Sequence, residues 1–453
     1  MSKFVKLRKG FNIKLAGSAK KKLVDSISPN VFALKPSDFY GIDRPKLLVA
    51  EGDSVKAGSP LMFDKMQPDV KFTAPVSGEV VEIKRGKKRK LLEIKILADK
   101  QLEYLDFKKY TVSELSNLTR EDILSNLLPS GIWPRFIQRP YGVIANPEDK
   151  PKAIFISSFD SHPLAPGYDF LLRGDDQFFQ TGLDIIKKLT PGKVHLNIDS
   201  DAEVTPLFGA VTGVQVNKFS GPHPSGNVGV QIHHLDPINK GEVAWTISPY
   251  GVTQIGKLFL EGVYDASKVF ALAGPPVKDP QYYRTYEGAC IENFVENNLS
   301  DRHVRFISGN VLTGERIPQN GFLGYYDHLI TVLKEGDYSE FIGWMMPTSK
   351  KLSFHRAFGL MSFLNKNQEY DLDTNVRGEE RAFVQTGVFE QVTPMDILPT
   401  HLVKAIMAED YDDMEALGIY EVIEEDLALC EFVDVSKHPI QSSVREGLDF
   451  MID

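Results

Sequence analysis

The pattern of apolar and polar residues changes character several times along the chain. From Pro45 to Ile96, short β-type runs such as LLVAEGDSVKAGSPLM and VKFTAPVSGEVVEIK alternate with Gly and Pro. Short strands joined by regularly spaced turns predict a small β barrel or sandwich. We assign this predicted domain to residues 1–102.

An α/β pattern follows. Thr119 and Asp122 are spaced as a capping box and predict the start of a helix. The apolar run AIFISSF, which begins at Ala153, is typical of a strand buried on both faces. FFQTGLDIIKKL has helical spacing, and VHLNIDS, VQVNKFS and EVAWTIS have the character of further strands. These segments predict a doubly wound, Rossmann-like domain over residues 103–258.

The last third of the chain contains two further units. SKVFALAGPP, a short helix around Ile291, and RHVRFISGNVL form a compact β-α-β pattern that resembles a β-grasp (SLBB-like) domain, assigned to residues 259–330. Residues 331–453 are predicted to be mainly helical because their apolar residues recur at helical spacing from Pro394 onward. The predicted fold class is therefore α+β with several domains.

Composition limits the function classes. Apolar residues make up 42% and charged residues 25%, the balance of a globular chain. The longest stretch without Asp, Glu, Lys or Arg is interrupted by Gly and Pro, and no secretory signal opens the sequence, so we expect a cytoplasmic location. The two cysteines, Cys430 and Cys290, the latter in a predicted helix, are too few for a [4Fe-4S] cluster.

Positive charge is concentrated near the start of the chain. Residues 1–100 contain 22 Lys or Arg against 11 Asp or Glu, although the net charge of the whole chain is -9. A predicted hairpin carries the densest group, which is the candidate docking patch: Arg85, Lys87, Lys88, Arg89 and Lys90. Such a patch favours contact with anionic lipid or an acidic partner. The alternative is a solvated turn whose lysines protect an edge strand.

No catalytic or nucleotide motif is complete. In SGPHPSGNVGVQIHHLDP, Gly221 and Gly226 have the interval of a phosphate-binding loop, but Asn227 and Val228 occupy the places of its Lys and Ser or Thr. A dinucleotide fingerprint and a G-x-S-x-G elbow are also missing from the sequence. We therefore predict no catalytic residue within this chain.

Three histidines in the same segment raise the question of a metal. His233 and His234 are adjacent, and on a strand adjacent side chains point to opposite faces, so they are not expected to chelate one ion. His223 lies ten residues earlier. We favour structural roles for all three and predict no metal site.

The N-terminal β segment has a more specific character. Its phrases EGDSV, from Glu51, and APVSG, from Ala74, resemble the biotinyl and lipoyl carrier domains, whose modified lysine lies on a hairpin between these phrases. Lys65 stands in that region, but too far before Ala74, and Asp64 replaces the usual methionine. We predict an unmodified lysine and no covalently bound cofactor; a functioning carrier is the alternative.

Together, the carrier-like start, the GIWPRFIQRP loop, the GPHPSGNVG and HHLDP segment and the β-grasp unit resemble, in that order, the NqrA family of the Na⁺-translocating NADH:quinone reductase. The resemblance covers essentially the whole chain. It implies a peripheral subunit on the cytoplasmic side of the bacterial inner membrane, within an enzyme that couples NADH oxidation and quinone reduction to Na⁺ export. Its implied partners are the other subunits, including membrane subunits, and a quinone, while NADH and flavins are used by other subunits; nucleic acid is not implied.

The family layout also resembles RnfC and the flavin subunit of respiratory complex I. The alternative function is therefore that of a catalytic flavin subunit of this type. Such a subunit has a glycine-rich loop that admits FMN and four cysteines that hold an iron-sulfur cluster. Here the corresponding loop has only Gly131, followed by bulky side chains that would fill the space left open by glycines. The resemblance therefore implies a flavin-subunit scaffold without flavin or cluster.

A quinone pocket at the vacated flavin position is our hypothesis for the site. Its candidate residues are Trp133, Phe136, Arg139, Phe159 and His162. Aromatic rings can stack on a quinone, and His162 or Arg139 can donate hydrogen bonds to its carbonyl oxygens. The alternative is that these side chains only fill an unused cavity.

Overall fold

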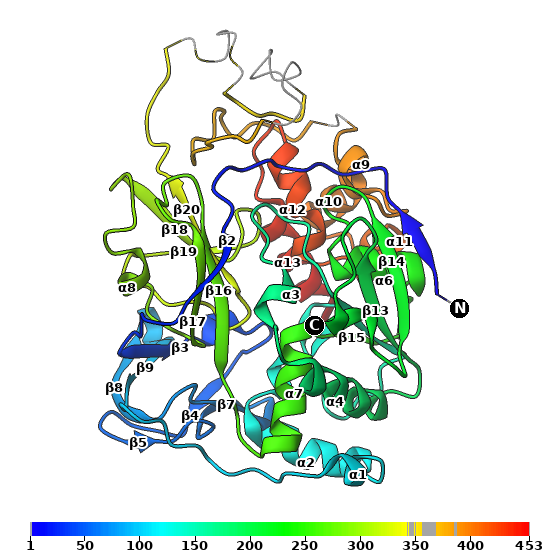
Figure 1. Cartoon of the computed structure of the whole chain (residues 1–453). Coiled ribbons are helices and arrows are strands. Elements are labelled where there is room, and N and C mark those ends of the chain that lie inside the picture. The colour runs from blue at the N-terminus through cyan, green and yellow to red at the C-terminus, as the bar shows by residue number, and fades with distance from the viewer. Residues whose placement is uncertain are drawn as a thin grey trace.

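The computed structural model describes residues 2–341, 343, 348, 350–355, 368–384 and 387–452. Within these residues the strands form sheets of seven, six, four and three strands. Figure 1 shows the two small sheets of the N-terminal barrel at one end of the molecule, beside the β-grasp sheet. The α/β sheet and its helices lie on the other side, and the C-terminal helices occupy the upper part between them.

The N-terminal barrel has two sheets. One has the order β3 (Val31–Leu34), β9 (Leu91–Ala98), β8 (Gly78–Arg85) and β5 (Ser54–Val55). The other has the order β4 (Pro45–Leu47), β6 (Pro60–Asp64) and β7 (Gln67–Thr73). Val80, Ile94 and Ile96 are fully buried between them. The predicted β character of this segment is confirmed.

The hairpin that carries Lys65 joins β6 to β7. Lys65 and Met66 are exposed, whereas the preceding Asp64 is buried. The Asp64 carboxylate accepts backbone N–H bonds from Asp43, Arg44 and Met66 at 3.0, 3.2 and 3.1 Å. The aspartate that replaces the usual methionine therefore fastens the hairpin to the segment before β4.

The two strands that precede the barrel belong to other sheets. Strand β1 (Phe4–Lys6) pairs in parallel with β14 at the edge of the α/β sheet. Strand β2 (Lys20–Val24) pairs in parallel with β17 of the β-grasp sheet. The blue segment in Figure 1 thus crosses the molecule and joins both domains. Hydrophobic periodicity does not reveal such pairing because it depends on partners far along the chain.

The α/β sheet has the order β1, β14 (Gln215–Ser220), β13 (Lys193–Asp199), β12 (Ala153–Ser157), β15 (Ala244–Thr246), β10 (Ile137–Arg139), β11 (Val143–Ile144). The first five strands in this order, from β1 to β15, run parallel to one another, and β10 and β11 form an antiparallel edge. The longer helices are α2 (Arg120–Ser130), α4 (Asp176–Ile186), α6 (Val228–Leu235) and α7 (Pro249–Glu261). Short helices are α1 (Val112–Leu115), α3 (Tyr168–Leu171) and α5 (Pro206–Gly209).

Helices cover both faces of this sheet. Phe155 of β12 belongs to the small core that contains Ile232 of α6. Ile154 and Ile156 belong to the main core, together with residues of α4 and α7. Because successive strand residues face opposite sides, the run AIFIS is apolar throughout. The predicted buried strand and doubly wound arrangement are confirmed, as is the Thr119–Asp122 capping box of α2.

The β-grasp sheet has the order β19 (Glu315–Ile317), β18 (Val304–Ser308), β20 (Leu329–Lys334), β16 (Ser267–Ala273), β17 (Gln281–Tyr286), β2. Its helix α8 (Glu292–Val295) begins after Cys290, which instead forms an isolated bridge with Phe322. The prediction that Cys290 lies in a helix is therefore wrong. The helix is only four residues long and begins two residues after Cys290.

The C-terminal unit is helical in the residues from Phe389 to Ile452. It contains α9 (Phe389–Val392), α10 (Pro399–Met407), α11 (Tyr411–Ala416), α12 (Glu424–Val433) and α13 (Ile440–Ile452). Leu402, Leu427, Val444 and Leu448 are fully buried in a core of their own. This agrees with the helical periodicity of the sequence.

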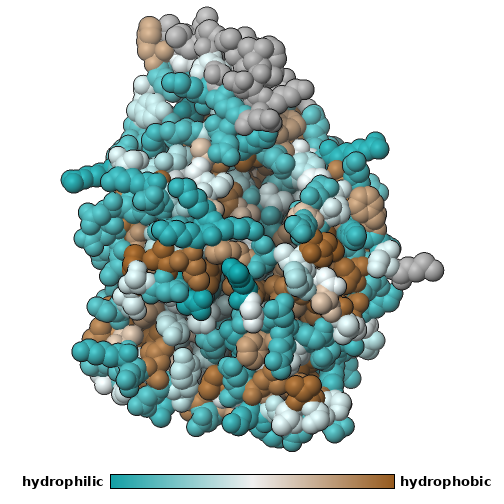
Figure 2. Space-filling model, in the orientation of Figure 1, coloured by the Kyte–Doolittle hydropathy of each residue, from teal (hydrophilic) through white to brown (hydrophobic). Residues whose placement is uncertain are grey.

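The described helices include none that is long and apolar enough to cross a bilayer. The face in Figure 2 is mainly hydrophilic, and its apolar residues form small patches separated by polar ones. A mixed surface of this kind is ordinary for a folded domain.

Candidate functional site

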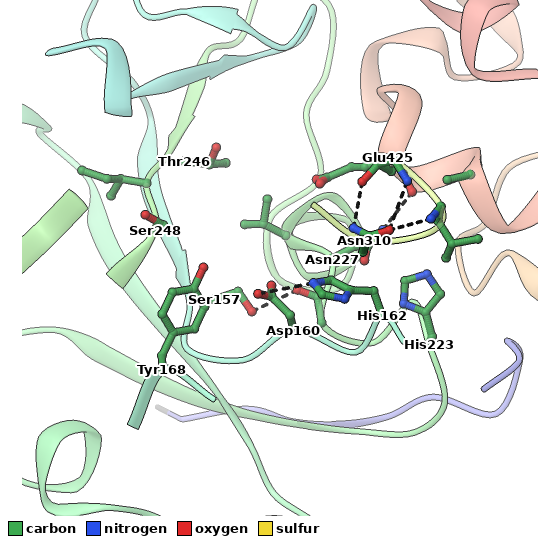
Figure 3. Close-up of a pocket in the computed structure, with 16 residues that line it drawn as sticks. Ser157, Asp160, His162, Tyr168, His223, Asn227, Thr246, Ser248, Asn310 and Glu425 are labelled. Carbon is green, nitrogen blue, oxygen red and sulfur yellow. Dashed lines mark hydrogen bonds and ion pairs between the residues drawn. The ribbon is translucent and has the colours of Figure 1, made fainter. Parts of the chain in front are cut away.

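A cleft of about 780 Å³ opens where the α/β domain, the β-grasp domain and the C-terminal helices meet, and Ser37, Asp38 and Tyr40 of the N-terminal domain also line it. We call it the three-domain cleft. It adjoins an inner chamber of about 160 Å³, shown in Figure 3. Both are lined by Asp160, His162, Tyr168, Val228, Thr246, Asn310, Thr313 and Glu425.

The strand order explains why the cleft lies at this edge of the sheet. The order reverses at β12, which has β13 on one side and β15 on the other. In open parallel sheets, ligands bind outside the carboxyl ends of the strands at such a reversal. Asp160 and His162 follow β12, and Thr246 ends β15. The cleft therefore occupies the usual ligand position of a doubly wound fold.

Two glycines of the GPHPSGNVG segment permit close packing around the inner chamber. A Cβ on Gly226 would lie 2.6 Å from the Ser161 nitrogen, and a Cβ on Gly229 would lie 2.3 Å from Asp426 Oδ2. The first glycine brings the loop after β14 against the loop after β12. The second brings α12 against α6. This glycine-rich segment thus serves domain packing.

A buried ion-pair cluster forms one wall of the cleft. Arg139 Nη1 lies 2.7 Å from Asp426 Oδ2, and Arg139 Nη2 lies 2.8 Å from Glu425 Oε1. The Arg139 and Asp426 side chains are 2% and 0% exposed, so this pair is removed from solvent, whereas the Glu425 side chain is 39% exposed at the cleft. Burial raises the pKa of the Glu425 carboxyl, and the neighbouring Asp426 carboxylate raises it further. The cluster joins the edge strand β10 to the start of α12.

Acidic, imidazole and hydroxyl groups line the inner chamber. Burial raises the pKa of the Asp160 carboxyl, and its polar neighbours, His162 and Tyr168, oppose this rise. Asp160 Oδ2 also lies 3.8 Å from His162 Nε2. Figure 3 shows His162 and His223 on one side of the chamber, with Tyr168 and Thr246 on the other. The chamber therefore offers hydrogen-bonding groups on opposing walls.

The structure separates the five residues of the predicted quinone pocket. Arg139 and His162 line the three-domain cleft. Phe159 lines a neighbouring pocket of about 490 Å³, to which His162 also contributes. Trp133 and Phe136 are fully buried and pack with their ring centroids 5.0 Å apart. Trp133 also packs against Trp245, and its Nε1 donates to the Ala145 carbonyl at 2.8 Å.

Several cleft residues were missed at the level of sequence. Asn310, Thr313 and Glu425 come from the β-grasp and C-terminal domains, and no local motif marks them. Tyr168 lies just beyond the predicted pocket segment. His223 was noted only as a possible metal ligand. It lines the inner chamber through the loop after β14.

The strand assumed for His233 and His234 is wrong, because both lie on α6. His233 Nδ1 lies 2.6 Å from Glu421 Oε2, and its Nε2 accepts the Asp396 N–H at 2.9 Å. His234 Nε2 lies 2.8 Å from the Pro394 carbonyl. No cluster of three or more His, Cys, Asp or Glu in the described part of the chain is placed to hold a metal ion.

Comparison with known proteins identifies the family. Three family models match in succession: the "NqrA N-terminal barrel-sandwich hybrid domain" over residues 5–99, the "NqrA second alpha/beta domain" over 118–264, and the "NQRA C-terminal domain" over 269–318. The A subunit of the Na⁺-translocating NADH-quinone reductase from Yersinia pestis is 37% identical over 445 residues, 98% of either chain. This chain belongs to the NqrA family. The predicted family and multidomain fold class are therefore confirmed.

Further relatives of the NqrA family show the same extent of similarity. Those from Serratia proteamaculans and Pasteurella multocida are 39% and 37% identical, and in each case 98% of both chains is covered. Among solved structures, a chain of an NAD⁺-reducing [NiFe]-hydrogenase matches with a TM-score of 0.37 and 11% identity, over 78% of this chain and 66% of that chain. A likeness this remote supports no argument about the site.

Proposed function

We propose that this chain is the peripheral NqrA component of a Na⁺-translocating NADH:quinone reductase and that its three-domain cleft receives a quinone head group. The names of its relatives supply the reaction of the assembly: NADH oxidation coupled to quinone reduction and Na⁺ transport. The chain takes part as one subunit on the cytoplasmic side of the membrane. NADH and flavins are bound by other subunits.

The position and lining of the three-domain cleft support the quinone proposal. Its volume falls in the range of about 300–1,000 Å³ typical of small-molecule sites. Tyr40 and Ile137 supply apolar surface at its wall, His162 supplies a hydrogen-bonding imidazole, and Arg139 supplies positive charge within the wall. A quinone head group is a flat ring with acceptor oxygens, so it requires this combination of surfaces.

Quinone titration tests the cleft. We expect ubiquinone-1 to bind the purified chain and Val228→Trp to weaken binding more than tenfold, because Val228 lines both the cleft and the inner chamber. Ser18→Trp is the matched control, since Ser18 lines only the neighbouring pocket. Dissociation constants are measured by isothermal titration calorimetry. Equal affinity for the wild type and Val228→Trp would exclude the cleft, and loss of binding in Ser18→Trp alone would move the site to the neighbouring pocket.

The basic hairpin supports a docking role. Lys87, Lys88, Arg89 and Lys90 are all exposed at the turn between β8 and β9. Among the described residues none of the four forms an ion pair, whereas Lys84 at the base of the hairpin pairs with Glu93 at 3.0 Å. An unpaired group of like charges is suited to an acidic surface of another subunit or to anionic lipid.

Charge reversal tests this docking role. One variant replaces Lys87, Lys88, Arg89 and Lys90 together by Glu. We expect this variant to associate with the membrane assembly at least tenfold more weakly than the wild type at about 50 mM salt. The control reverses four exposed lysines elsewhere: Lys22, Lys109, Lys150 and Lys193. Co-sedimentation with membranes measures association, and vesicles containing anionic lipid alone distinguish lipid from a protein partner. Association unchanged by the hairpin reversal, or lost equally in the control, would remove the role.

A further inference from the structure

His223 lines the inner chamber, and each polar atom of this residue is hydrogen-bonded except its ring Nε2. The His223 N–H donates to Asn12 Oδ1 at 2.8 Å, and its carbonyl accepts the Phe11 N–H at 2.8 Å. Its Nδ1 lies 3.0 Å from Ser161 Oγ. The residue is 3% exposed, and its buried Nε2 has no hydrogen-bond partner.

The other polar side chains that the structure describes in the chamber differ from His223 in that none has a buried atom without a partner. Glu425 pairs with Arg139, and Asp160 lies 3.8 Å from His162. Asn227 Nδ2 donates to the Glu425 carbonyl at 2.9 Å. Among the described residues that line the chamber, His223 Nε2 is the one buried side-chain nitrogen or oxygen without a partner. Buried polar atoms are normally hydrogen-bonded, so an orphan atom on a residue that lines a cavity points to a ligand.

The hydrogen bonds around Ser161 determine which nitrogen carries the proton. Ser161 Oγ accepts the Gly226 N–H at 2.8 Å. Within the described residues, the Ser161 hydroxyl hydrogen has no acceptor other than His223 Nδ1. Ser161 therefore donates to Nδ1, and the proton of the neutral ring lies on Nε2. Burial lowers the pKa of His223 to about 3, which keeps the ring neutral at physiological pH.

We propose that His223 is the ligand-binding donor of the inner chamber and that its Nε2–H binds a carbonyl oxygen of the quinone ring. The inference rests on the proposed quinone cleft and assigns one contact within it. A neutral donor suits a ketone oxygen, which is an uncharged acceptor. Phe11 and Asn12 of the N-terminal arm hold the backbone of His223, and Ser161 holds its ring, before the ligand enters.

Binding of matched ligands to matched variants tests the contact. We expect His223→Phe, which retains a ring without the donor, to bind ubiquinone-1 about tenfold more weakly than the wild type. His223→Gln, which replaces the donor with an amide, should recover part of the affinity. His195→Phe is the control, since His195 is 5% exposed, also has its pKa lowered by burial, and lies on β13 outside the chamber.

A ligand without carbonyls separates hydrogen bonding from packing. We expect 2,3-dimethoxytoluene to bind the wild type and His223→Phe with equal affinity. Equal weakening of both ligands in His223→Phe, or unchanged ubiquinone-1 affinity, would overturn the assignment of His223. Absence of ubiquinone-1 binding to the wild type would overturn the quinone cleft itself. Circular dichroism confirms that each variant is folded.

A spectroscopic signature tests the proton position without reference to affinity. In ¹H–¹⁵N spectra of histidine-labelled protein, the His223 proton should lie on Nε2 between pH 6 and 8, and its resonance should shift when ubiquinone-1 is added. Ser161→Ala should allow both tautomers. A proton found on Nδ1 in the wild type, or an Nε2–H resonance unmoved at saturating ubiquinone-1, would contradict the proposal.

Discussion

Glu287→Ala is expected to lower the free energy of unfolding by about 4 kcal/mol, because it removes the counter-ion of a buried arginine. Glu287 is 3% exposed and follows β17 of the β-grasp domain. Its carboxylate pairs with Arg135, which lies in the turn before β10 of the α/β domain and is also 3% exposed. The pair therefore joins two domains across a dry interface.

The same carboxylate accepts three further hydrogen bonds. Tyr264 Oη, Gln254 Nε2 and Tyr250 Oη donate to it at 2.7, 2.8 and 3.1 Å. The Arg135 guanidinium also stacks on the Tyr325 ring, 3.6 Å from its centroid. This contact does not replace the negative charge of Glu287. Substitution by Ala thus leaves a buried cation and several polar groups without their acceptor.

Urea unfolding of the wild type and three variants measures this effect. Glu287→Gln should have an intermediate stability, since it retains an acceptor but removes the charge. Asp169→Ala is the control, because it breaks the Lys21–Asp169 pair of 2.9 Å, in which Lys21 is 64% exposed. Such a surface pair contributes about 1 kcal/mol or less. Similar losses for Glu287→Ala and Asp169→Ala would show that the buried network is not a stabilising contact between the domains.

The second large effect is expected at Arg139, where substitution by Ala should destabilise the chain by about 4 kcal/mol near pH 8. Arg139 is the cation that faces both Glu425 and the fully buried Asp426 at the start of α12. Without it, two adjacent carboxylates lie in the cleft wall with no counter-ion at that contact. The C-terminal helices should therefore separate from β10 more readily than in the wild type.

The loss of stability in Arg139→Ala, relative to the wild type, should depend on pH. Burial raises the pKa of Glu425, whereas Arg139 opposes that rise, so its removal raises the pKa of Glu425 further. An acid whose pKa is higher in the folded than in the unfolded state loses stability as pH rises from about 4.5 through its folded pKa. The difference between variant and wild type should therefore be smaller at pH 5 than at pH 8.

Arg445→Ala provides the matched control at the same helix terminus. Arg445 pairs with Glu424, but its side chain is 22% exposed, so its loss should reduce stability by about 1 kcal/mol. Arg139→Lys should retain part of the wild-type stability because it keeps the charge without the two-pronged geometry. Unfolding midpoints at pH 5 and pH 8 give the comparison. A stability loss in Arg139→Ala that is larger at pH 5 than at pH 8 would contradict the role given to Glu425.

Local sequence patterns were sufficient to predict an element where the apolar and polar residues of one short segment determine its structure. The run AIFIS identifies β12, the Thr119–Asp122 box identifies the start of α2, and the alternation around β6 to β9 identifies the barrel. In each case the periodicity of side chains records which faces are buried. Local patterns failed for the helix that holds His233, because an eight-residue apolar helix and a buried strand have similar composition.

The sequence by itself therefore determined the family, the class of each domain and the basic hairpin, since these depend on residue order and local periodicity. Only the tertiary structure decided that β1 and β2 leave the barrel for two other sheets and that Trp133 is a core residue. It also brought His162, His223 and Glu425 together from segments up to 263 positions apart. The reason is physical: strand order and domain contacts result from long-range packing, which no short segment encodes.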